Sequence, residues 1–360
     1  MIYAIIFGII VIAALVNILT NYKHKSLVNI YFIIISLFML FIAAFRDGIG
    51  YDYANYKKLF DLIHYRDASS SEVNIELGFY AIMKLFTNNY LVVFFTATIS
   101  ILLKVIYIDR YSKDKIISLL LYFSGVFIMF DMGVIRQGLS IGITLLSIKH
   151  IKERSFTKFL FIICFAALFH VSAIIFLPLY FLGNKSFSRK TYYFITLVVL
   201  IISFADLTKL IVNLLMYIPI GIIQSKLMWY SSLETGELAT SLIKRVLFLV
   251  LFIEYFKVKK ISDSDSYIYL NGYFLSIVIM GLFSSIDIIG GRGSTGLYFL
   301  QIFIFAIVMK SMSHIYLRFL MLILVILLSV NSITGPINDG STSNQPYLPY
   351  ENILLKLFGG

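Results

Sequence analysis

Long apolar runs alternate with short polar segments along almost the whole chain. Clear examples are residues 30–44, 91–103, 159–169, 196–204 and 319–330. Inside a bilayer the backbone has no water to bond, so a spanning segment must be a helix or a strand of a closed barrel. The strict alternation of apolar and polar residues that marks barrel strands is missing from these runs. The pattern therefore predicts an all-α, membrane-embedded fold.

The polar breaks between the apolar runs differ in charge, and this difference orients the predicted helices. Lys and Arg gather in six short segments, whereas most Asp and Glu residues lie between them. The positive-inside rule places the basic segments in the cytoplasm. They are Lys23–Lys25, Arg110–Lys115, Lys149–Lys158, Lys185–Lys190, Lys257–Lys260 and Lys310–Arg318. The alternation predicts a polytopic helical bundle of about 12 transmembrane segments with both termini outside. The predicted segments lie near residues 2–20, 30–45, 91–108, 116–131, 134–149, 159–170, 172–183, 191–205, 242–256, 268–286, 297–310 and 317–332.

Two pairs of predicted segments are short or broken. The stretch 116–149 is interrupted at Asp131–Arg136, and the stretch 159–183 is continuous except for His170, although both of its flanks are basic. Both flanks are cytoplasmic only if the chain turns back near His170, which gives a re-entrant pair whose arms are shorter than the roughly 20 residues of a full span. Such segments are tolerated where they line a polar cavity. The competing interpretation is one long tilted helix with His170 at mid-membrane.

The domain organisation predicted from this pattern is a single transmembrane domain, residues 1–332, followed by an external tail, residues 333–360. Two external loops are long, at 46–90 and 206–241, and the first contains a short predicted helix at 77–86. The first apolar run lacks a basic leader and a small-residue cleavage site, so we expect it to be retained as a helix.

The composition agrees with lipid as the main solvent. Hydrophobic residues make up 60% of the chain and charged residues 14%, against about a quarter charged in soluble domains. The net charge of +11 follows from the basic loops, so it orients helices against anionic lipid and does not indicate nucleic-acid binding. The single cysteine, Cys164, lies in an apolar run and is expected to be a small core residue.

Three charged features are interpreted as structural. Asp263-Ser264-Asp265 spells the D-x-D of nucleotide-sugar glycosyltransferases, but its short cytoplasmic loop leaves no room for a nucleotide-binding domain, so a solvated turn is the better interpretation. Lys104 lies near the inner end of its helix and is expected to extend towards the headgroups. Glu254, also near an inner end, is expected to be paired or hydrated.

Polar residues that can carry chemistry gather in four stretches at predicted external helix ends. These are Arg46–Tyr56, Asn74–Phe79, Gly133–Gly138 and Phe169–Ser172, and Gly290–Gly293 adds a later loop. The guanidinium groups of Arg46, Arg136 and Arg292 suit a diphosphate, and Asp52, Glu76 and His170 can accept a proton from a hydroxyl. Taken singly, each has a structural alternative: a helix-end arginine also binds headgroups, a lone histidine is as often a hydrogen-bonded core residue, and Asp47 can pair with Arg46.

The order and spacing of these residues resemble the EpsG family, a branch of the Wzy-type polysaccharide polymerases. The resemblance rests on Arg46-x-x-x-Gly50-x-Asp52-Tyr53-x-x-Tyr56, Glu76-x-Gly78-Phe79, Ile135-Arg136-Gln137-Gly138-Leu139 and Phe169-His170-x-Ser172. It covers residues 40–185, and Arg292 with Tyr298 resembles a later Arg–Tyr segment of the family. Tyr51 departs from the pattern, which has a small residue there.

The resemblance implies a GT-C-like membrane glycosyltransferase at the external face of the bacterial inner membrane. It would join undecaprenyl-diphosphate-linked oligosaccharide units into a surface polysaccharide without a metal or other cofactor. The catalytic residues would be His170, Asp52 and Glu76, and the substrate-binding residues would be Arg46, Arg136, Arg292, Tyr53, Tyr56, Gln137 and Tyr298. The implied partners are the lipid-linked donor and acceptor and membrane lipids, with a chain-length regulator and a flippase as further candidates.

Two alternatives stay open from the sequence. A flippase for the same lipid-linked oligosaccharides predicts internal repeats and polar groups spread along the bundle, whereas the polar candidates here collect on one side. An O-antigen-ligase-like transferase shares the chemistry and differs in the acceptor. For the base we favour His170, because a histidine ordinarily changes protonation near neutral pH, and we expect Asp52 to orient the acceptor sugar.

Overall fold

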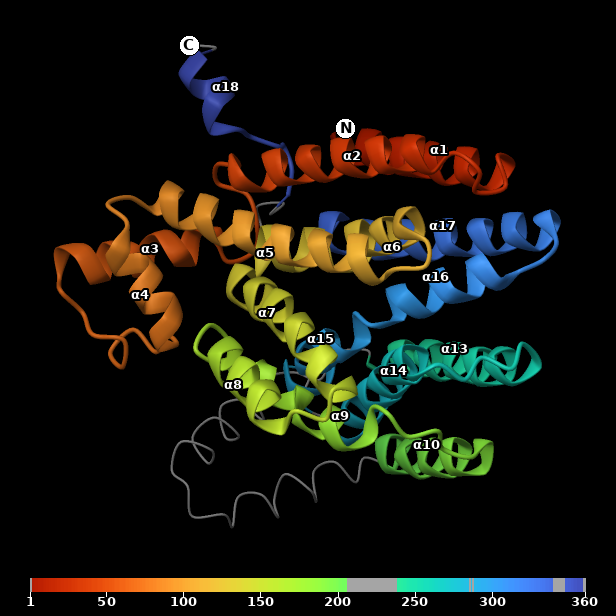
Figure 1. The fold of residues 1–360 in the computed structure, drawn as a ribbon. Coiled ribbons are helices and arrows are strands. Elements are labelled where there is room, and N and C mark those ends of the chain that lie inside the picture. Colours follow the sequence, from red (N-terminus) through yellow and green to blue (C-terminus); the bar gives the residue numbers. More distant parts are fainter. Residues whose placement is uncertain (1, 206–237, 285, 287, 339–346, 359–360) are drawn as a thin grey trace. The chain divides into compact units, whose positions relative to one another are not determined.

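Helices form all the regular elements in the part of the chain that the structure describes (Figure 1). The computed structural model describes residues 2–205, 238–284, 286, 288–338 and 347–358. Within these ranges the sole β-bridge pairs Arg46 with Asn352. The predicted all-α fold is confirmed. Most of the predicted loop 206–241 lies outside the described residues.

Five helical segments are long and apolar enough to cross a membrane. They are α1 (Ile2–Leu19), α2 (Lys25–Ala44), α5 (Asn89–Tyr111), the continuous pair α6 (Lys115–Tyr122) and η1 (Phe123–Gly133), and α17 (Ile315–Asn338). A sixth is the bent pair of residues 289–298 and 301–311, made of η3 (Ile288–Gly293), α15 (Ser294–Tyr298) and α16 (Gln301–Ser311). The chain is therefore a multi-pass membrane protein.

Helices also occupy the other predicted spans, but they are shorter or more polar. They are α7 (Ile135–Lys152), α8 (Phe156–Ala167), η2 (Val171–Phe176) with α9 (Leu177–Leu182), α10 (Arg189–Phe204), α13 (Leu238–Val258) and α14 (Ser264–Leu282). Length and composition thus support five or six crossings among the described residues, and 12 crossings stay a prediction.

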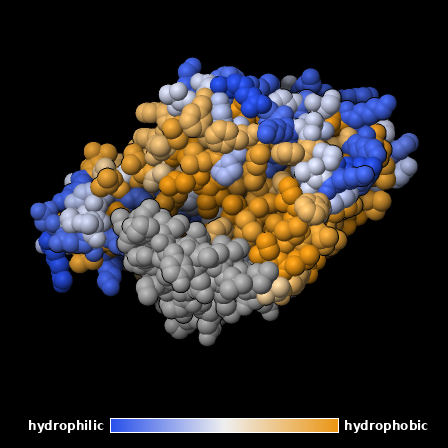
Figure 2. Space-filling model, turned by 90° about the horizontal axis from the view of Figure 1, so that it is seen from below, coloured by the Kyte–Doolittle hydropathy of each residue, from blue (hydrophilic) through white to orange (hydrophobic). Residues whose placement is uncertain are grey.

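The surface of the protein is rich in large apolar side chains. Figure 2 shows a broad hydrophobic area on one face, with hydrophilic residues at its margins. Exposed examples are Ile34 and Leu37 on α2, Phe194 on α10 and Leu327 on α17. An apolar surface of this kind needs lipid to cover it. The expectation for Cys164 was wrong, because its side chain lies on the exposed side of α8.

The chain forms two compact units. The first comprises residues 1–148, 157–174 and 305–360, and the second comprises residues 149–156 and 175–304. In the first unit α2 packs on α5, α1 packs on α2, α6 and α17, and α17 also packs on η1. In the second unit α14 is central and contacts α9, α10, α13 and α15.

The predicted external loop 46–90 is largely helical. It contains α3 (Tyr53–Tyr65) and α4 (Leu77–Leu85), and α4 matches the helix predicted at 77–86. The C-terminal segment packs against the start of this loop: Ile353 N donates to Phe45 O at 2.9 Å, and Asp47 N donates to Glu351 O at 3.1 Å. The predicted tail is thus tied to the first unit, and it ends in the short helix α18 (Ile353–Phe358).

The chain turns back between the start of α8 and the end of α9. The ring of Phe156, the first residue of α8, lies 5.0 Å from the Tyr180 ring and 5.9 Å from the Phe181 ring, centroid to centroid. Just beyond them, Asn184 Nδ2 donates to Ile151 O at 2.9 Å. The two basic flanks therefore lie side by side. This hairpin agrees with the re-entrant interpretation, and one long tilted helix across His170 is wrong.

The predicted break at 131–136 is also present. The last part of the span is the π-helix η1, and a non-helical Val134 separates it from α7. A π-helix is a local irregularity that often accompanies functional sites. Gly50, with φ +114°, approaches η1 so closely that a Cβ there would lie 2.1 Å from Met132 O. The loop after α2 can therefore pack against the break only with glycine at this position.

Candidate active site

The four polar stretches singled out in the sequence meet in the first unit. Gly78 N donates to Leu168 O at 2.8 Å, so the start of α4 lies against the turn after α8. Glu76 reaches both Arg136, at the start of α7, and the backbone N–H of Val171, beside His170. The Arg136 guanidinium lies 5.9 Å from the centroid of the Tyr56 ring. The stretches therefore form one polar cluster, which we call the Arg136 cluster: Asp52, Tyr56, Glu76, Arg136 and His170.

Arg136 is the centre of this cluster. Its Nη1 donates to Glu76 Oε2 at 2.7 Å, and 18% of its side chain is exposed. The guanidinium also lies over the Phe79 ring, 6.0 Å from the centroid. Its Nε is buried and has no hydrogen-bond partner among the described residues. An unmatched, charged N–H of this kind can bind an oxygen of an anionic ligand, because a guanidinium presents its donors as a planar fork.

Asp52 and Tyr56 are one helical turn apart in the sequence. Asp52 precedes α3, and Tyr56 Oη donates to Asp52 Oδ2 at 3.1 Å. Burial, with the nearby Asp52 carboxylate, raises the pKa of the Tyr56 hydroxyl well above its usual range. Tyr56 therefore stays protonated and remains a donor. Asp52 is half-buried, so it keeps access to solvent or a bound sugar.

Tyr53 belongs to a neighbouring set of contacts. Its hydroxyl donates to Asp47 Oδ1 at 3.1 Å, and Lys356 Nζ donates to Asp47 Oδ2 at 2.8 Å. Burial acts to raise the pKa of the Asp47 carboxyl, but the hydrogen bonds from Lys356 and Tyr53 outweigh it and hold that pKa below its usual range. Asp47 thus pairs with Lys356, and the suggested pairing with Arg46 is wrong.

Arg46 lies inside its loop, away from the expected position at the surface. It is 2% exposed, and its guanidinium donates to the carbonyls of Ala43 and Ile49, the latter from Nε at 3.1 Å. Its backbone bridges to Asn352. In this position the arginine closes the loop that carries Asp52, and its donors are directed at backbone oxygens. The expectation that Arg46 supports a diphosphate therefore has no geometric basis.

Glu76 is held at both carboxylate oxygens. Oε2 accepts from Arg136, and Oε1 accepts from Val171 N at 3.4 Å. It precedes α4 as the N-cap residue. A carboxylate engaged in this way fixes the direction of the arginine and the position of the turn after α8, which suits an anchor better than a base.

His170 lies at the turn between α8 and η2. Its Nδ1 is 2.7 Å from Ser172 Oγ, and Ser140 Oγ of α7 donates to His170 O at 3.3 Å. The side chain is half-buried. Gln137, by contrast, is buried next to Arg136, with 1% of its surface exposed. A role for Gln137 in direct substrate contact therefore has less support than one for His170.

Arg292 and Tyr298 belong to the second unit. Arg292 is exposed on η3. The Tyr298 ring lies 3.9 Å from the guanidinium of Arg245, and it stacks on Tyr273 at a centroid distance of 5.8 Å. Arg245 is buried and donates to Ser294 Oγ at 2.8 Å. Arg245 was not among the residues predicted from the sequence, although a basic residue within an apolar helix indicates a polar site.

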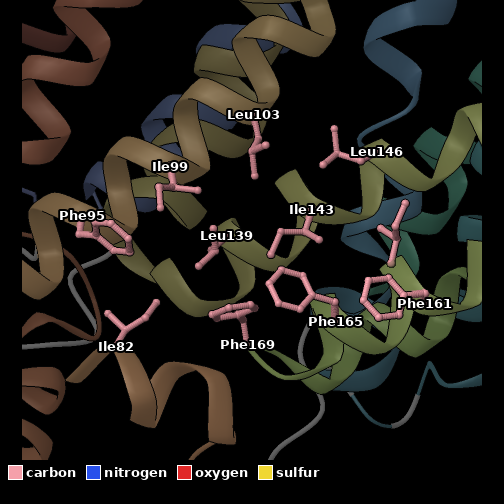
Figure 3. A pocket seen from close by; sticks show the side chains of 11 residues that line it. Ile82, Phe95, Ile99, Leu103, Leu139, Ile143, Leu146, Phe161, Phe165 and Phe169 are labelled. Atoms are coloured by element: carbon pink, nitrogen blue, oxygen red, sulfur yellow. The ribbon is translucent and has the colours of Figure 1, made fainter. Parts of the chain in front are cut away.

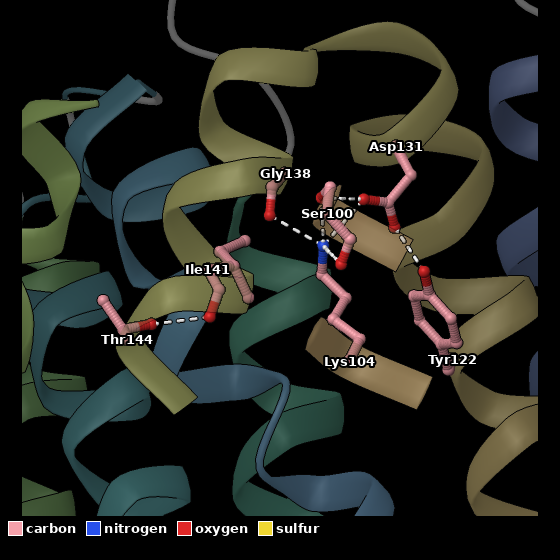
Figure 4. A network of polar contacts seen from close by, with 7 residues as sticks. All are labelled: Ser100, Lys104, Tyr122, Asp131, Gly138, Ile141 and Thr144. Atoms are coloured by element: carbon pink, nitrogen blue, oxygen red, sulfur yellow. Dashed lines mark hydrogen bonds and ion pairs between the residues drawn. The ribbon is translucent and has the colours of Figure 1, made fainter. Parts of the chain in front are cut away.

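A second network missed from the sequence is buried beside the Arg136 cluster (Figure 4). Lys104 Nζ lies 2.7 Å from Asp131 Oδ1, 2.7 Å from Ser100 Oγ and 2.7 Å from Gly138 O. Tyr122 Oη donates to Asp131 Oδ2 at 2.7 Å. Lys104 and Asp131 are both fully buried, so the expectation that Lys104 extends towards the headgroups is wrong. The network joins α5, α6, η1 and α7, and it reaches α7 at Gly138, two residues beyond Arg136.

The charged features interpreted as structural have structural partners. Asp263 caps α14 by accepting from Ser266 N at 3.0 Å. Asp265 pairs with Lys152 at 3.1 Å, and Glu254 pairs with Arg189 at 3.0 Å. In the described part of the chain no group of three or more His, Cys, Asp or Glu side chains is arranged to hold a metal ion.

The sequence model of the EpsG family matches residues 29–352, and the chain therefore belongs to this family. The match covers nearly the whole chain and confirms the resemblance based on the motifs of residues 40–185. The family is similar to Wzy-type polymerases, which makes this chain a membrane protein of polysaccharide synthesis. No curated protein and no solved structure matches the chain significantly.

Proposed function

We propose that this EpsG-family protein is a glycosyltransferase that polymerises undecaprenyl-diphosphate-linked repeat units into a surface polysaccharide. The observation that carries the proposal is the Arg136 cluster. A mostly buried arginine with an unmatched Nε lies beside a carboxylate and a tyrosine in a multi-pass membrane protein, and the same carboxylate also bonds the turn that carries a histidine. These are the groups that transfer from a lipid diphosphate needs.

The reaction is a displacement at the anomeric carbon of the donor glycan. The bond from this carbon to the diphosphate oxygen breaks, and a bond to the acceptor hydroxyl oxygen forms. The electron pair of the broken bond leaves with the lipid diphosphate, and the proton of the acceptor hydroxyl passes to a base. Arg136 stabilises the negative charge that grows on the departing diphosphate, because its charge is preorganised by Glu76 in a site of low polarity.

His170 is the proposed base and Asp52 the proposed sugar ligand. In the structure Ser172 N donates to His170 Nδ1 at 3.3 Å, and Ser172 Oγ lies 2.7 Å from the same nitrogen. To accept a proton at Nε2, His170 must take the tautomer with its proton on Nδ1, in which Ser172 Oγ accepts from Nδ1 in place of the bond from Ser172 N. The Asp52 carboxylate, held by Tyr56, can accept hydrogen bonds from two sugar hydroxyls. Glu76 serves as the anchor of Arg136 and of the turn that carries His170.

The proposal includes the topology predicted from the basic loops. In it the Arg136 cluster faces the external side of the cytoplasmic membrane, where flipped lipid-linked units arrive, and the chain makes 12 crossings in a GT-C-like arrangement. The side-by-side basic flanks of the hairpin, at Ile151 and Asn184, support this orientation because both belong on one side. A chain-length regulator and a flippase are the proposed partners.

Purified protein in liposomes, supplied with one defined undecaprenyl-diphosphate repeat unit, tests the activity. Wild type should release lipid diphosphate and build a ladder of lipid-linked oligomers. Arg136→Ala should not, whereas Lys84→Ala, which removes a cation from an exposed pair with Asp67, should match wild type. Translocation of the unit without a new glycosidic bond would indicate a flippase. Transfer only to a different added acceptor would indicate a ligase.

A further inference from the structure

A groove with only apolar side chains runs through the first unit, beside the Arg136 cluster (Figure 3). Its volume is about 400 Å³. Three helices supply most of its wall. Phe95, Ile99 and Leu103 of α5 face Leu139, Ile143 and Leu146 of α7. Side chains of α8 and of the turn after it, from Phe161 to Phe169, complete the wall together with Ile82 of α4. Because successive lining residues on α5 are four apart, the groove follows the helix for about 12 Å.

One end of the groove meets the Arg136 cluster. Leu139 follows Arg136 by one turn of α7, and Phe169 is the residue before His170. Ile82 lies one turn beyond Phe79, whose ring is under the Arg136 guanidinium. Figure 3 shows Ile82, Leu139 and Phe169 together at this end, with Leu146 and Phe161 at the other. The structure thus places a charged arginine next to one end of an apolar groove, an arrangement complementary to a ligand with an anionic head and a hydrocarbon tail.

The groove is open at the side and closed at its base. Phe161 is 72% exposed, and Phe165 and Leu146 are also exposed. At the base α5 and α7 are in close contact at Gly142, where a Cβ would lie 3.2 Å from Ser100 O and 3.2 Å from Leu103 Cβ. In a multi-pass membrane protein, an exposed apolar wall of this kind is the part of the surface that lipid covers. A hydrocarbon chain can therefore enter from the bilayer without crossing water.

We propose that this groove binds the isoprenoid chain of the lipid-linked donor while its diphosphate contacts Arg136. The proposal rests on the proposed function, since it places the carrier of that same substrate. A groove in lipid gains little from the hydrophobic effect, because the bilayer is equally apolar. Its contribution is orientation: a chain held along α5 and α7 fixes where the attached diphosphate, and hence the anomeric carbon, lies relative to Arg136 and His170.

The head of the ligand decides between the carrier and an ordinary phospholipid. Both have hydrocarbon tails, but the Arg136 cluster, next to one end of the groove, combines the unmatched Nε of Arg136 with the sugar-binding candidates Asp52 and Tyr56. A diphosphate that bears a glycan matches both groups, whereas a phospholipid headgroup matches the arginine alone. The lipid-linked carrier is therefore the occupant that fits both the apolar groove and the Arg136 cluster.

Photocrosslinking tests the binding in nanodiscs of phosphatidylglycerol and phosphatidylethanolamine. Full-length protein carries benzoylphenylalanine in place of Phe161, or in place of Phe194 on α10, which is similarly exposed at 67% and lies outside the groove. Radiolabelled undecaprenyl diphosphate should crosslink saturably at position 161 and be displaced by unlabelled undecaprenyl diphosphate but not by added phosphatidylglycerol. Equal labelling at both positions, or equal displacement by phosphatidylglycerol, would overturn the proposal.

Kinetics separate this inference from the proposed function. Ile99→Trp fills the groove, and Ile106→Trp places the same ring on the exposed side of the same helix, where Ile106 is 60% exposed. Ile99→Trp should raise KM for the undecaprenyl donor by roughly tenfold or more. A donor whose diphosphate carries no isoprenoid chain should show little change, and Ile106→Trp should leave KM for both donors unchanged. Polymer made by Ile99→Trp at unchanged KM would reject the groove and leave the function standing. Saturable crosslinking at position 161, combined with no polymer from the wild-type protein, would support binding in the groove and reject the proposed polymerase function.

Discussion

Arg136 Nη1 lies 2.7 Å from Glu76 Oε2, and this ion pair joins the first turn of α7 to the start of α4 across a separation of 60 residues. Both side chains are largely buried, with 18% and 20% exposed. Water therefore screens the pair only partly. Because Glu76 also accepts from Val171 N, the direction of the guanidinium and the position of the His170 turn are set by one carboxylate.

Replacing Arg136 tests whether its planar fork is needed. Arg136→Lys keeps the charge but loses the paired donors, so the rate of polymer formation should fall about a hundredfold or more. Glu76→Gln keeps a hydrogen-bond acceptor near Arg136 while losing the charge, and the rate should fall about tenfold. Both rates are measured on purified protein with equal size-exclusion profiles. An Arg136→Lys protein with the wild-type rate would remove Arg136 from the reaction.

Close backbone contact at Gly78 should make this position intolerant of a side chain. A Cβ at Gly78 would lie 2.8 Å from Leu168 O, the carbonyl to which Gly78 N donates. Gly78→Ala should therefore destabilise the protein by about 1–3 kcal/mol and lower its activity, because the His170 turn must move. Gly8→Ala in α1 is the control, since nothing lies within 4 Å of a Cβ there. Thermal unfolding in detergent measures the Tm of both variants. Equal Tm values for Gly78→Ala and Gly8→Ala would contradict the expected clash.

The buried pair of Lys104 and Asp131 should be interdependent. Lys104→Met or Asp131→Leu alone leaves one fully buried charge without its partner, which ordinarily costs about 3–5 kcal/mol. The double variant removes both charges and should recover much of that loss in Tm and in yield of monodisperse protein. The activity should recover less, because Gly138 O loses the Lys104 bond that holds α7 next to Arg136. Strictly additive losses of Tm would show that the two charges act separately.

The sequence predicted the all-α membrane fold and the members of the Arg136 cluster for the same physical reason. Apolar periodicity marks helices in lipid, and a polar residue that interrupts it must lie at an end or in a polar site. Arg136 and His170 each interrupt an apolar stretch. Asp52 and Tyr56 are four residues apart, a spacing that brings side chains together on a helix, and a hydrogen bond joins them.

Contacts between segments far apart in the chain could not be predicted in this way. Arg46 was expected at a surface because a helix-end arginine ordinarily reaches water, whereas the C-terminal segment at Asn352 covers it. Lys104 was expected to extend towards the headgroups because it lies near the inner end of its helix, whereas it pairs with Asp131, 27 residues away on a π-helix. A single sequence does not show which distant acid neutralises which base.

The topology predicts which side of the membrane His170 and Ser186 face. Cysteines are introduced singly in a Cys164→Ser background, which is needed because Cys164 is exposed. His170→Cys should react with an impermeant thiol reagent added outside intact cells. Ser186→Cys, exposed in the basic segment after α9, should react only after permeabilisation. The reverse pattern would place the Arg136 cluster in the cytoplasm and remove the proposed site of polymerisation.

The pH dependence of single-turnover rates tests the base. The imidazole of a histidine is ordinarily protonated at acid pH and then has no lone pair to accept a proton, so the wild-type rate should fall as pH drops through the range in which histidines titrate. His170→Gln should lose about a hundredfold in rate and lose this acid limb. Ser172→Ala removes the hydroxyl that would accept from Nδ1 in the tautomer the base needs, so it should lower the rate less, and Ser172→Thr should restore it. Asp52→Asn separates the two roles: as a sugar ligand Asp52 should affect KM for the acceptor and leave the acid limb in place. A His170→Gln protein that keeps the wild-type rate and limb would move the base to Asp52, because both oxygens of Glu76 are already bound.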